Sequence, residues 1–323
     1  MNEIQKIQVP VAAEMAQCRE RFDLSFRHDS PLLSEALAMI GSHKGKMMRP
    51  LLVLLVSKLF DGIDENAQNI ACAYEAFHTA SLVHDDVVDE SDERRGQSSV
   101  NSKEGNKVAV LAGDYVLASA LHYLSLTGMP ELVDIMSGAA RCLAEGELLQ
   151  LHNTEVQSIS EDTYFKIIRN KTAALFAACT HSAALNAHAT SEQVEKLKTF
   201  GEIVGICFQI RDDIFDYSND DIGKPTGNDM KEGKLTLPVI YALNKSDDTD
   251  MHLIAQRVKK QVATSDEIAR LVAFTKEQKG IEYAISSMNS YAEKAKRIMM
   301  EFDECAARDA LLMYVDYVVG RSF

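Results

Sequence analysis

The distribution of proline sets the strongest limit on the fold. The six prolines stand at positions 10, 31, 50, 130, 225 and 238, and the stretches 51–129, 131–224 and 239–323 contain none. Within these stretches apolar residues recur at spacings of three and four, which is the period of an amphipathic helix, and strand-like alternation is rare. Because proline ends or kinks a helix, its absence permits long uninterrupted helices. The pattern predicts an all-α protein.

We expect helices near residues 32–43, 47–60, 65–91, 105–126, 131–152, 161–186, 191–218 and 235–244, and several more after residue 250. Two of these helix starts have the spacing of a capping box, Thr190 with Gln193 and Ser158 with Glu161. No stretch rich in Ser, Gly and Pro divides the chain. Residues 1–323 are therefore predicted to form one domain, with a division near residue 220 as the alternative.

The composition argues against several classes of protein. With 34 Lys and Arg against 48 Asp and Glu, the net charge of −14 opposes binding to phosphate backbones, so we expect no nucleic-acid partner. The longest strongly apolar run, 51–56, is far shorter than the roughly 18 residues of a membrane span, and the N-terminal residues do not resemble a signal peptide. The six scattered cysteines fit a reducing compartment. We therefore expect a cytoplasmic protein without a transmembrane segment.

The pattern Asp-Asp-x-x-Asp occurs twice and is the strongest functional signal in the chain. Its two copies are Asp85, Asp86 and Asp89, and Asp212, Asp213 and Asp216. On a helix, residues three and four apart share a face, so each copy gathers three carboxylates within about one turn. Hard oxygen ligands without His or Cys favour Mg²⁺, which proteins commonly share with the oxygens of a phosphate. The alternative interpretation is a pair of solvated acidic helix ends.

Basic residues stand in short stretches around these acids. The stretches supply Lys46, Arg49, Arg94, Arg95, Lys171, Lys224, Lys231 and Lys234. Arginine can bind phosphate oxygens in a bidentate manner, and lysine acts as a mobile point charge. The segment 223–233 contains three glycines and alternating charges. It is predicted to be a lid that becomes ordered over bound phosphate.

Seven motifs follow one another between Gly45 and Leu243: GKMMRP, FHTASLVHDDVVDESDERRG, NKVAVLAGDY, GELLQL, KTAALF, FGEIVGICFQIRDDIFDY and GKPTGNDMKEGKLTLP. In order and spacing they resemble the trans-isoprenyl diphosphate synthases, the chain-elongating prenyltransferases. The resemblance implies the isoprenoid synthase fold, an all-α bundle of long helices around a deep central cavity, and a homodimer. The chain departs from the family pattern at Met47, Met48 and Gln97, where basic residues are frequent.

The resemblance also implies a role for each matched residue. Three Mg²⁺ ions, bound to the diphosphate of an allylic substrate, would be held by Asp85, Asp86, Asp89, Asp212, Asp213 and Asp216. Isopentenyl diphosphate would be bound by Lys46, Arg49, His78 and Arg95. The allylic diphosphate would be bound by Arg94, Lys171, Thr172, Gln209, Lys224 and Lys234. The residues expected to act in catalysis are Asp85, Asp86, Asp89, Asp212, Asp213 and Lys171.

The implied reaction is an electrostatically assisted condensation. The cations neutralise the departing pyrophosphate, the alkene of isopentenyl diphosphate attacks the allylic carbocation, and loss of a proton leaves a chain five carbons longer. No protein base is evident, so we expect the released pyrophosphate to accept this proton. The lid and the apolar helices would exclude water from the cation. The product partitions into a bilayer, so we expect transient membrane contact during its release.

Small residues precede the first aspartate cluster on the predicted helix. They are Ala80 and Ser81, and Phe77 lies a further turn away. In the family, aromatic residues at the two small positions stop growth at short products, so this chain resembles the long-chain synthases that make quinone side chains. Residues 67–84 would cover about 27 Å as a helix, a depth of several isoprene units beyond farnesyl. We predict an all-trans polyprenyl diphosphate of about C35 to C45, centred on octaprenyl.

Three alternatives remain open. The first is a shorter-chain synthase that makes farnesyl or geranylgeranyl diphosphate. The second is a terpene cyclase or a head-to-head condensing synthase, which needs no isopentenyl site; Lys46, Arg49 and Arg95 favour elongation over it. The third is a non-catalytic partner subunit of an active synthase, and the two intact aspartate clusters argue against it.

Overall fold

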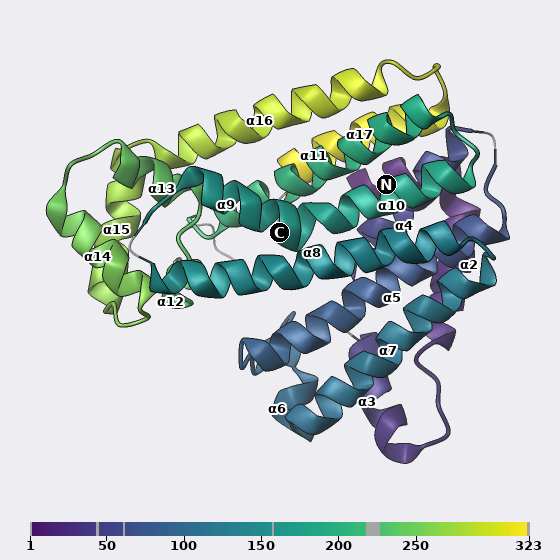
Figure 1. The fold of residues 1–323 in the computed structure, drawn as a ribbon, viewed down its shortest axis with the longest axis horizontal. Helices are drawn as coiled ribbons and strands as arrows, with labels where there is room; N and C mark the ends of the chain where they lie inside the picture. The colour runs from purple at the N-terminus through teal and green to yellow at the C-terminus, as the bar shows by residue number, and fades with distance from the viewer. Residues whose placement is uncertain (1, 43–44, 61, 157, 218–226, 322–323) are drawn as a thin grey trace. The chain divides into compact units, whose positions relative to one another are not determined.

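The computed structural model describes residues 2–42, 45–60, 62–156, 158–217 and 227–321. Over these ranges the chain is almost entirely helical (Figure 1), which confirms the predicted all-α class. The elements are α1 (Glu3–Gln8), η1 (Val9–Val11), α2 (Ala12–Leu24), α3 (Pro31–Ser42), α4 (Met48–Lys58), α5 (Glu65–Val88), β1 (Glu93–Arg94), β2 (Gln97–Ser98), α6 (Val100–Glu104), α7 (Asn106–Leu126), α8 (Pro130–Glu155), α9 (Glu161–Ile168), η2 (Arg169–Ala173), α10 (Ala174–Asn186), α11 (Ser191–Phe215), α12 (Asn228–Lys231), α13 (Leu237–Asn244), α14 (Thr249–Lys259), α15 (Ser265–Glu277), α16 (Gly280–Met299) and α17 (Ala306–Gly320).

Contacts divide the chain into two compact units. Unit 1 comprises residues 1–137, 178–197 and 303–311, and unit 2 comprises residues 138–177, 198–302 and 312–323. Four of the divisions fall inside α8, α10, α11 and α17, the fifth lies between α16 and α17, and none lies near residue 220. The single domain over residues 1–323 stays a prediction.

Two buried helices form the centre of unit 1. Every residue is buried from 67 to 77 in α5 and from 51 to 57 in α4, and most of these side chains are apolar. The buried polar exceptions are Ser57, Gln68, Asn69 and Glu75. α5 packs along α7 and also contacts α4 and α2 (Figure 1). The alanines of α5 let these helices approach closely. The buried hydroxyl of Tyr74 lies 2.7 Å from Ser182 Oγ, so it has the hydrogen-bond partner that burial requires.

In unit 2, helices α13, α14 and α15 surround a separate apolar core. Val239 and Leu243 of α13, Ile254 of α14 and Leu271 of α15 are almost completely buried in it. α16 packs against α13. This core supports α12 and the end of α14, which border the site described below.

Most of the predicted helices are confirmed to within a few residues. The capping box at Thr190 is present, because its N–H donates to Gln193 Oε1 at 2.9 Å and its Oγ1 accepts from the N–H of Gln193 at 3.3 Å. The box predicted at Ser158 is wrong. Ser160 caps α9 instead, with its hydroxyl accepting from the N–H of Thr163 at 3.2 Å.

The sequence did not predict the N-terminal helices α1 and α2 or a short antiparallel hairpin, β1–β2. Arg95 and Gly96 form the turn of this hairpin, with φ values of 53° and 75°. Two consecutive residues at positive φ match the twist of a two-residue hairpin turn, and glycine adopts this conformation freely. The segment 92–104, between the helices predicted at 65–91 and 105–126, therefore contains a hairpin with Arg94 in a strand and Arg95 in the turn.

Helix α7 is, within the described residues, the one helix long and apolar enough to cross a bilayer. Length and composition are the only basis for this statement, and core helices of soluble proteins meet the same criterion. α7 packs along α5 in unit 1, yet Leu111 and Leu121 are 67% and 44% exposed. Both leucine side chains are therefore accessible to solvent.

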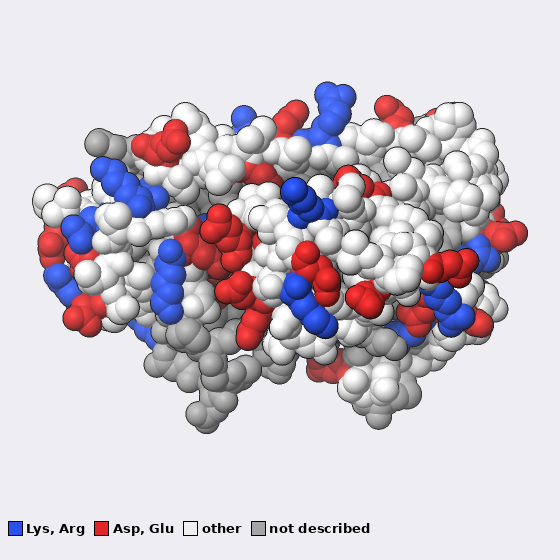
Figure 2. All heavy atoms as spheres, turned by 90° about the horizontal axis from the view of Figure 1, so that it is seen from below, with Lys and Arg blue, Asp and Glu red and all other residues white. Residues whose placement is uncertain are grey.

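Figure 2 shows how charged side chains are distributed on one face of the molecule. On the face drawn in Figure 2, Lys and Arg lie singly or in small groups among Asp and Glu, with uncharged surface between them.

Candidate functional site

The first aspartate cluster lies at the C-terminal end of α5 in unit 1. Asp85 and Asp86 belong to its last turn, and Asp89 is the first residue beyond the helix. The sequence predicted that all three aspartates share a helix that ends near residue 91. This prediction is wrong by about one turn, because the positive φ of Glu90, 49°, is incompatible with a continuing helix. The N–H of Asp89 still donates to the carbonyl of Asp85 at 2.8 Å, so the three residues remain within one turn.

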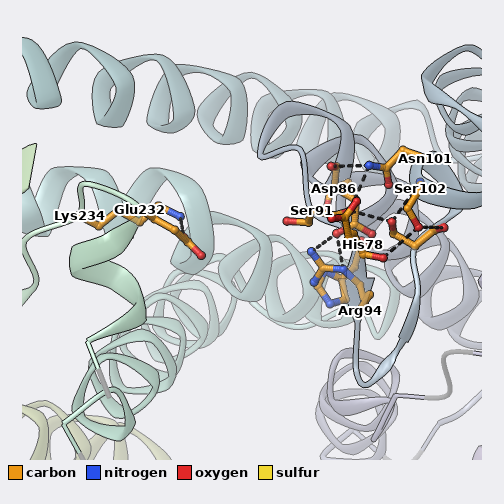
Figure 3. Close-up of polar contacts among 11 residues, drawn as sticks. His78, Asp86, Ser91, Arg94, Asn101, Ser102, Glu232 and Lys234 are labelled. Atoms are coloured by element: carbon orange, nitrogen blue, oxygen red, sulfur yellow. Dashed lines mark hydrogen bonds and ion pairs between the residues drawn. The ribbon is translucent and has the colours of Figure 1, made fainter. Parts of the chain in front are cut away.

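Asp86 is the buried member of this cluster, at 5% exposure, and it is paired with Arg94 (Figure 3). Arg94 Nε and Nη2 lie 2.7 and 2.5 Å from Asp86 Oδ1. Asn101 Nδ2 donates to the carbonyls of Asp86 and Ser91, both at 3.1 Å. The hairpin and α6 are thereby fastened to the end of α5, which holds Arg94 over the carboxylate.

A pocket beside this cluster gathers several of the predicted binding residues. Asp86, Arg94, Arg95 and His78 line it together with apolar side chains that include Phe22, Phe26 and Val83. Gly45 and Met47 also line it, on either side of Lys46. Lys46 is exposed, and Arg49 at the start of α4 is 8% exposed. Unit 1 therefore brings the predicted isopentenyl diphosphate residues to one region.

Gly45 is a residue of this pocket that the sequence analysis did not single out. A Cβ atom at Gly45 would lie 3.0 Å from Arg95 Nη1, so the guanidinium rests against the backbone of the GKMMRP motif. This close approach explains a glycine there and places Arg95 beside Lys46.

The charge state of His78 follows from its surroundings. Desolvation, together with the nearby Arg49, Arg95 and Arg94 guanidiniums, lowers the pKa of His78 well below its usual value. His78 is therefore neutral at neutral pH and offers a hydrogen bond rather than a charge. Glu75, which the sequence analysis missed, lines the same pocket at 7% exposure, and burial raises its pKa. The sequence feature that could have identified Glu75 is an acidic residue within a run of mostly apolar residues, one turn before His78.

Two residues of the motif NKVAVLAGDY, Gly113 and Asp114, contact His84, the residue before the first cluster. His84 Nε2 lies 3.3 Å from Asp114 Oδ1, and the ring lies against Gly113, where a methyl group would overlap it. These contacts between α5 and α7 fix the turn that carries Asp85 and Asp86. Sequence spacing alone could not reveal them.

The second aspartate cluster has the same arrangement at the end of α11 in unit 2. Asp212 and Asp213 belong to the last turn of the helix, and Asp216 lies just beyond it. The Asp216 carboxylate accepts from the N–H groups of Asn228 at 2.8 Å and Asp229 at 3.2 Å, so it binds the start of α12. Asp212 is paired with Arg321, whose guanidinium also stacks on the Phe208 ring at 3.8 Å.

A chain of hydrogen bonds joins two predicted residues of unit 2, Thr172 and Gln209, to Asp213. Thr172 Oγ1 donates to Gln209 Oε1 at 2.7 Å, and Gln209 Nε2 donates to Asp213 Oδ1 at 2.9 Å. Tyr164 donates its hydroxyl to Asp213 Oδ2 at 2.5 Å. Tyr164 was missed by the sequence analysis, because a tyrosine in an amphipathic helix is usually a core residue. Both oxygens of Asp213 are thus held in place.

Lys171 and Thr172 belong to η2, a π-helical turn between α9 and α10. Such turns interrupt regular helices and are frequent at functional sites. Glycines of two other helices leave room for the backbone of this turn. A Cβ atom at Gly146 would lie 2.9 Å from Lys171 N, and one at Gly205 would lie 2.5 Å from Ala173 Cα. Lys171 Nζ pairs with Glu147 Oε1 at 2.7 Å.

The Gly205→Ala variant is expected to lower the free energy of unfolding by about 1–3 kcal/mol, because the new methyl group would meet backbone that cannot swing aside. Gly138→Ala in α8 is the matched control. A Cβ at Gly138 meets nothing within 4 Å, so helix propensity should raise stability by up to about 1 kcal/mol. Urea unfolding measures the free energy of unfolding of both variants. An equal change in this free energy for the two variants would contradict the packing of Gly205 against η2.

One pocket in unit 2 is lined by Lys171, Thr172, Gln209, Asp213 and Lys234. Lys234 Nζ lies 2.6 Å from Glu232 Oε2 (Figure 3). Five of the predicted residues are therefore assembled around a single cavity. Lys224 lies outside the described residues, as does the first part of the predicted lid, residues 223–226. The rest of the lid, residues 227–233, is described and contains α12.

The carboxylates of unit 2 fit a bound cation. Burial, with the nearby Asp212 and Asp216, raises the pKa of Asp213 to about 7, and burial with Asp213 and Asp216 raises the pKa of Asp229 to about 8. Crowded carboxylates of this kind are stabilised by a divalent cation. Within the described ranges no three acidic, His or Cys side chains are close enough to ligate one ion by themselves.

The predicted chain-length residues lie on α5 outside both of these pockets. Phe77 and Ala80 are 5% and 1% exposed, so protein covers this side of the helix. The Ser81 hydroxyl donates to the carbonyl of His78 at 2.9 Å. Their role in product length stays a prediction.

Comparison with known proteins identifies the family. A model of the polyprenyl synthetase family matches residues 30–275. An octaprenyl diphosphate synthase of Haemophilus influenzae is 33% identical over 100% of this chain and 98% of its own length. A crystal structure described as a geranylgeranyl pyrophosphate synthase from Bacteroides thetaiotaomicron is 44% identical, covers 99% of this chain and 100% of its own, and has a TM-score of 0.88.

A third similar structure is described as a polyprenyl synthase from Caulobacter crescentus complexed with calcium and isoprenyl diphosphate. It is 30% identical, covers 98% of both chains and has a TM-score of 0.91. The two aspartate-ended helices, the pockets beside them and these matches have one explanation: the chain belongs to the polyprenyl synthetase family and is a prenyltransferase of isoprenoid biosynthesis with the all-α isoprenoid synthase fold.

Proposed function

We propose that this enzyme condenses isopentenyl diphosphate with an allylic diphosphate and repeats the step to give a long all-trans polyprenyl diphosphate. One observation carries the proposal. Each unit holds an Asp-Asp-x-x-Asp cluster at the end of a long helix, next to a pocket lined by basic side chains. Acids that bind cations and bases that bind phosphate are the two requirements for removing a diphosphate.

In this proposal the pocket of unit 1 binds isopentenyl diphosphate. Arg95 and Lys46 bind the phosphate oxygens, neutral His78 supplies a hydrogen bond, and Phe22 and Phe26 contact the hydrocarbon. Arg94, assigned to the allylic diphosphate, holds the Asp86 carboxylate in position. The apolar lining keeps water from the reacting carbons.

The pocket of unit 2 then binds the allylic diphosphate. Lys171 and Lys234 neutralise its oxygens, and the hydrogen bonds from Tyr164 and Gln209 orient Asp213. Mg²⁺ is the expected cofactor, in three ions, and when bound it supplies positive charge that stabilises the leaving pyrophosphate. The residues that would hold it are Asp85, Asp86, Asp89, Asp212, Asp213 and Asp216. The released pyrophosphate accepts the proton lost from the new chain.

For the product we propose about C35 to C45, centred on octaprenyl, as the side chain of a quinone. The Haemophilus relative named an octaprenyl diphosphate synthase and the small residues Ala80 and Ser81 support this length. A shorter product is the second candidate, because the Bacteroides structure with 44% identity is described as a geranylgeranyl pyrophosphate synthase.

We further propose that the enzyme acts as a cytoplasmic homodimer. The exposed leucines of α7, Leu111 and Leu121, would be covered in such a dimer. Sedimentation equilibrium of the purified chain tests this state.

The test of the proposed function uses the purified chain alone, with Mg²⁺, farnesyl diphosphate and labelled isopentenyl diphosphate. We expect incorporation of label into the prenyl product, and its loss when a chelator removes the metal. Absence of incorporation with dimethylallyl, geranyl, farnesyl and geranylgeranyl diphosphates alike would contradict the proposal and favour a non-catalytic partner subunit.

A further inference from the structure

Lys259, the last residue of α14, is a buried cation outside every motif considered above. Its exposure is 4%, while the adjacent Lys260 is exposed. Lys259 Nζ donates to the carbonyls of Val156 at 2.5 Å and Ser158 at 2.9 Å. An ammonium group has three N–H donors, so these two bonds leave one donor for another acceptor.

No carboxylate in the described part of the chain pairs with the charge of Lys259. Within the residues that the structure describes, its polar contacts are the two carbonyls of Val156 and Ser158. By contrast, Lys171 pairs with Glu147 and Lys234 with Glu232. A buried charge is unfavourable unless a counter-charge or strong hydrogen bonds compensate it, and burial accordingly lowers the pKa of Lys259.

Lys259 lines the same unit 2 pocket as Lys171 and Lys234. The end of α14 is also fastened to the turn that carries Lys234. Gln261 Nε2 donates to the carbonyl of Glu232 at 3.0 Å, and a Cβ at Gly233 would lie 3.3 Å from the carbonyl oxygen of Lys259. Three ammonium groups therefore border one cavity, and two of them come from segments fixed to each other.

We propose that Lys259 is a further anion-binding residue of this pocket, whose ammonium group binds an oxygen of the allylic diphosphate. The two carbonyls position the group, and the anion supplies the counter-charge that the described residues do not. This inference rests on the function proposed above for the pocket. A purely structural role is the alternative, since Val156 directly follows α8 and an ammonium at its carbonyl stabilises a helix end.

Three variants separate these roles. Lys259→Met removes both the charge and the donors, Lys259→Gln removes the charge but keeps N–H donors, and Lys260→Met removes a neighbouring exposed charge as the matched control. For Lys259→Met and Lys259→Gln we expect KM for farnesyl diphosphate to rise about 10- to 100-fold. This is the loss of affinity that corresponds to the free energy of one charge-assisted hydrogen bond. KM for isopentenyl diphosphate should stay within about twofold, and Lys260→Met should match the wild type in both constants.

Calorimetry with inorganic pyrophosphate and Mg²⁺ gives a measurement that needs no condensation. Its Kd should rise about 10- to 100-fold in both Lys259 variants and fall back toward the wild-type value in Lys259→Arg, which restores the charge. An unchanged pyrophosphate Kd in Lys259→Gln would overturn the proposal and leave Lys259 as a cap of α8. If Lys259→Met does not fold, Lys259→Gln and Lys259→Arg provide the same comparison. Failure of the wild type to condense substrates would count against the proposed function alone, since pyrophosphate binding would still report on Lys259.

Discussion

The Asp86→Ala variant is expected to lower kcat about 10²- to 10³-fold, the loss found when one preorganised electrostatic group is removed from an active site. Asp86 is the buried carboxylate of the first cluster, and Arg94 makes two contacts with it. Its removal takes away a proposed metal ligand and also releases the Arg94 guanidinium from its position in the pocket. Steady-state kinetics with farnesyl diphosphate and isopentenyl diphosphate measure the change.

Asp92→Ala is the matched control for Asp86→Ala. Asp92 is an exposed acid that follows the same cluster, and its backbone carbonyl, which the substitution retains, makes the local hydrogen bonds. We expect its kcat to remain within about twofold of the wild type. Urea unfolding should show that Asp86→Ala is folded under the assay conditions. A folded Asp86→Ala enzyme with a kcat within threefold of wild type would contradict the role of the first cluster.

The Ala80→Tyr variant is expected to shift the main product from about C40 to C20 or shorter. Ala80 stands about one turn before Asp85 on α5, and its side chain is 1% exposed. A tyrosine there adds a ring to a position at which the growing chain is proposed to pass. Chain-length analysis of the dephosphorylated products measures the shift.

Ala80→Ser keeps the side chain small and should leave the product distribution unchanged. Because a large residue at a buried site can strain the core, Ser81→Phe at a half-buried position provides a second variant with the same expected shift. A folded and active Ala80→Tyr enzyme with the wild-type product distribution would rule out Ala80 as a residue that sets chain length.

Helices and aspartate clusters could be predicted from local patterns. The absence of proline over long stretches and the spacing of apolar residues depend on neighbouring positions alone, and α5, α7 and α11 were predicted to within a few residues at most of their ends. The end of α5 was placed too late, since nothing in the sequence marks the positive φ of Glu90.

Residues whose roles arise from tertiary packing were missed. Tyr164 is ordinary in its own helix and becomes part of the site because Asp213 of α11 lies within hydrogen-bond distance. Gly205 is required by the backbone of η2, which is remote in sequence. Lys259 looks like a surface lysine beside Lys260, and only the carbonyls after α8 and the shared pocket distinguish the two.

The chain length of the wild-type product tests the central claim most directly. The purified enzyme should be incubated with Mg²⁺, farnesyl diphosphate and an excess of isopentenyl diphosphate, and the dephosphorylated products separated by length. The account predicts a Mg²⁺-dependent distribution centred near C40. An end point at C20 with the same substrates would contradict the claim of a long-chain synthase and give the chain the activity named for its Bacteroides relative.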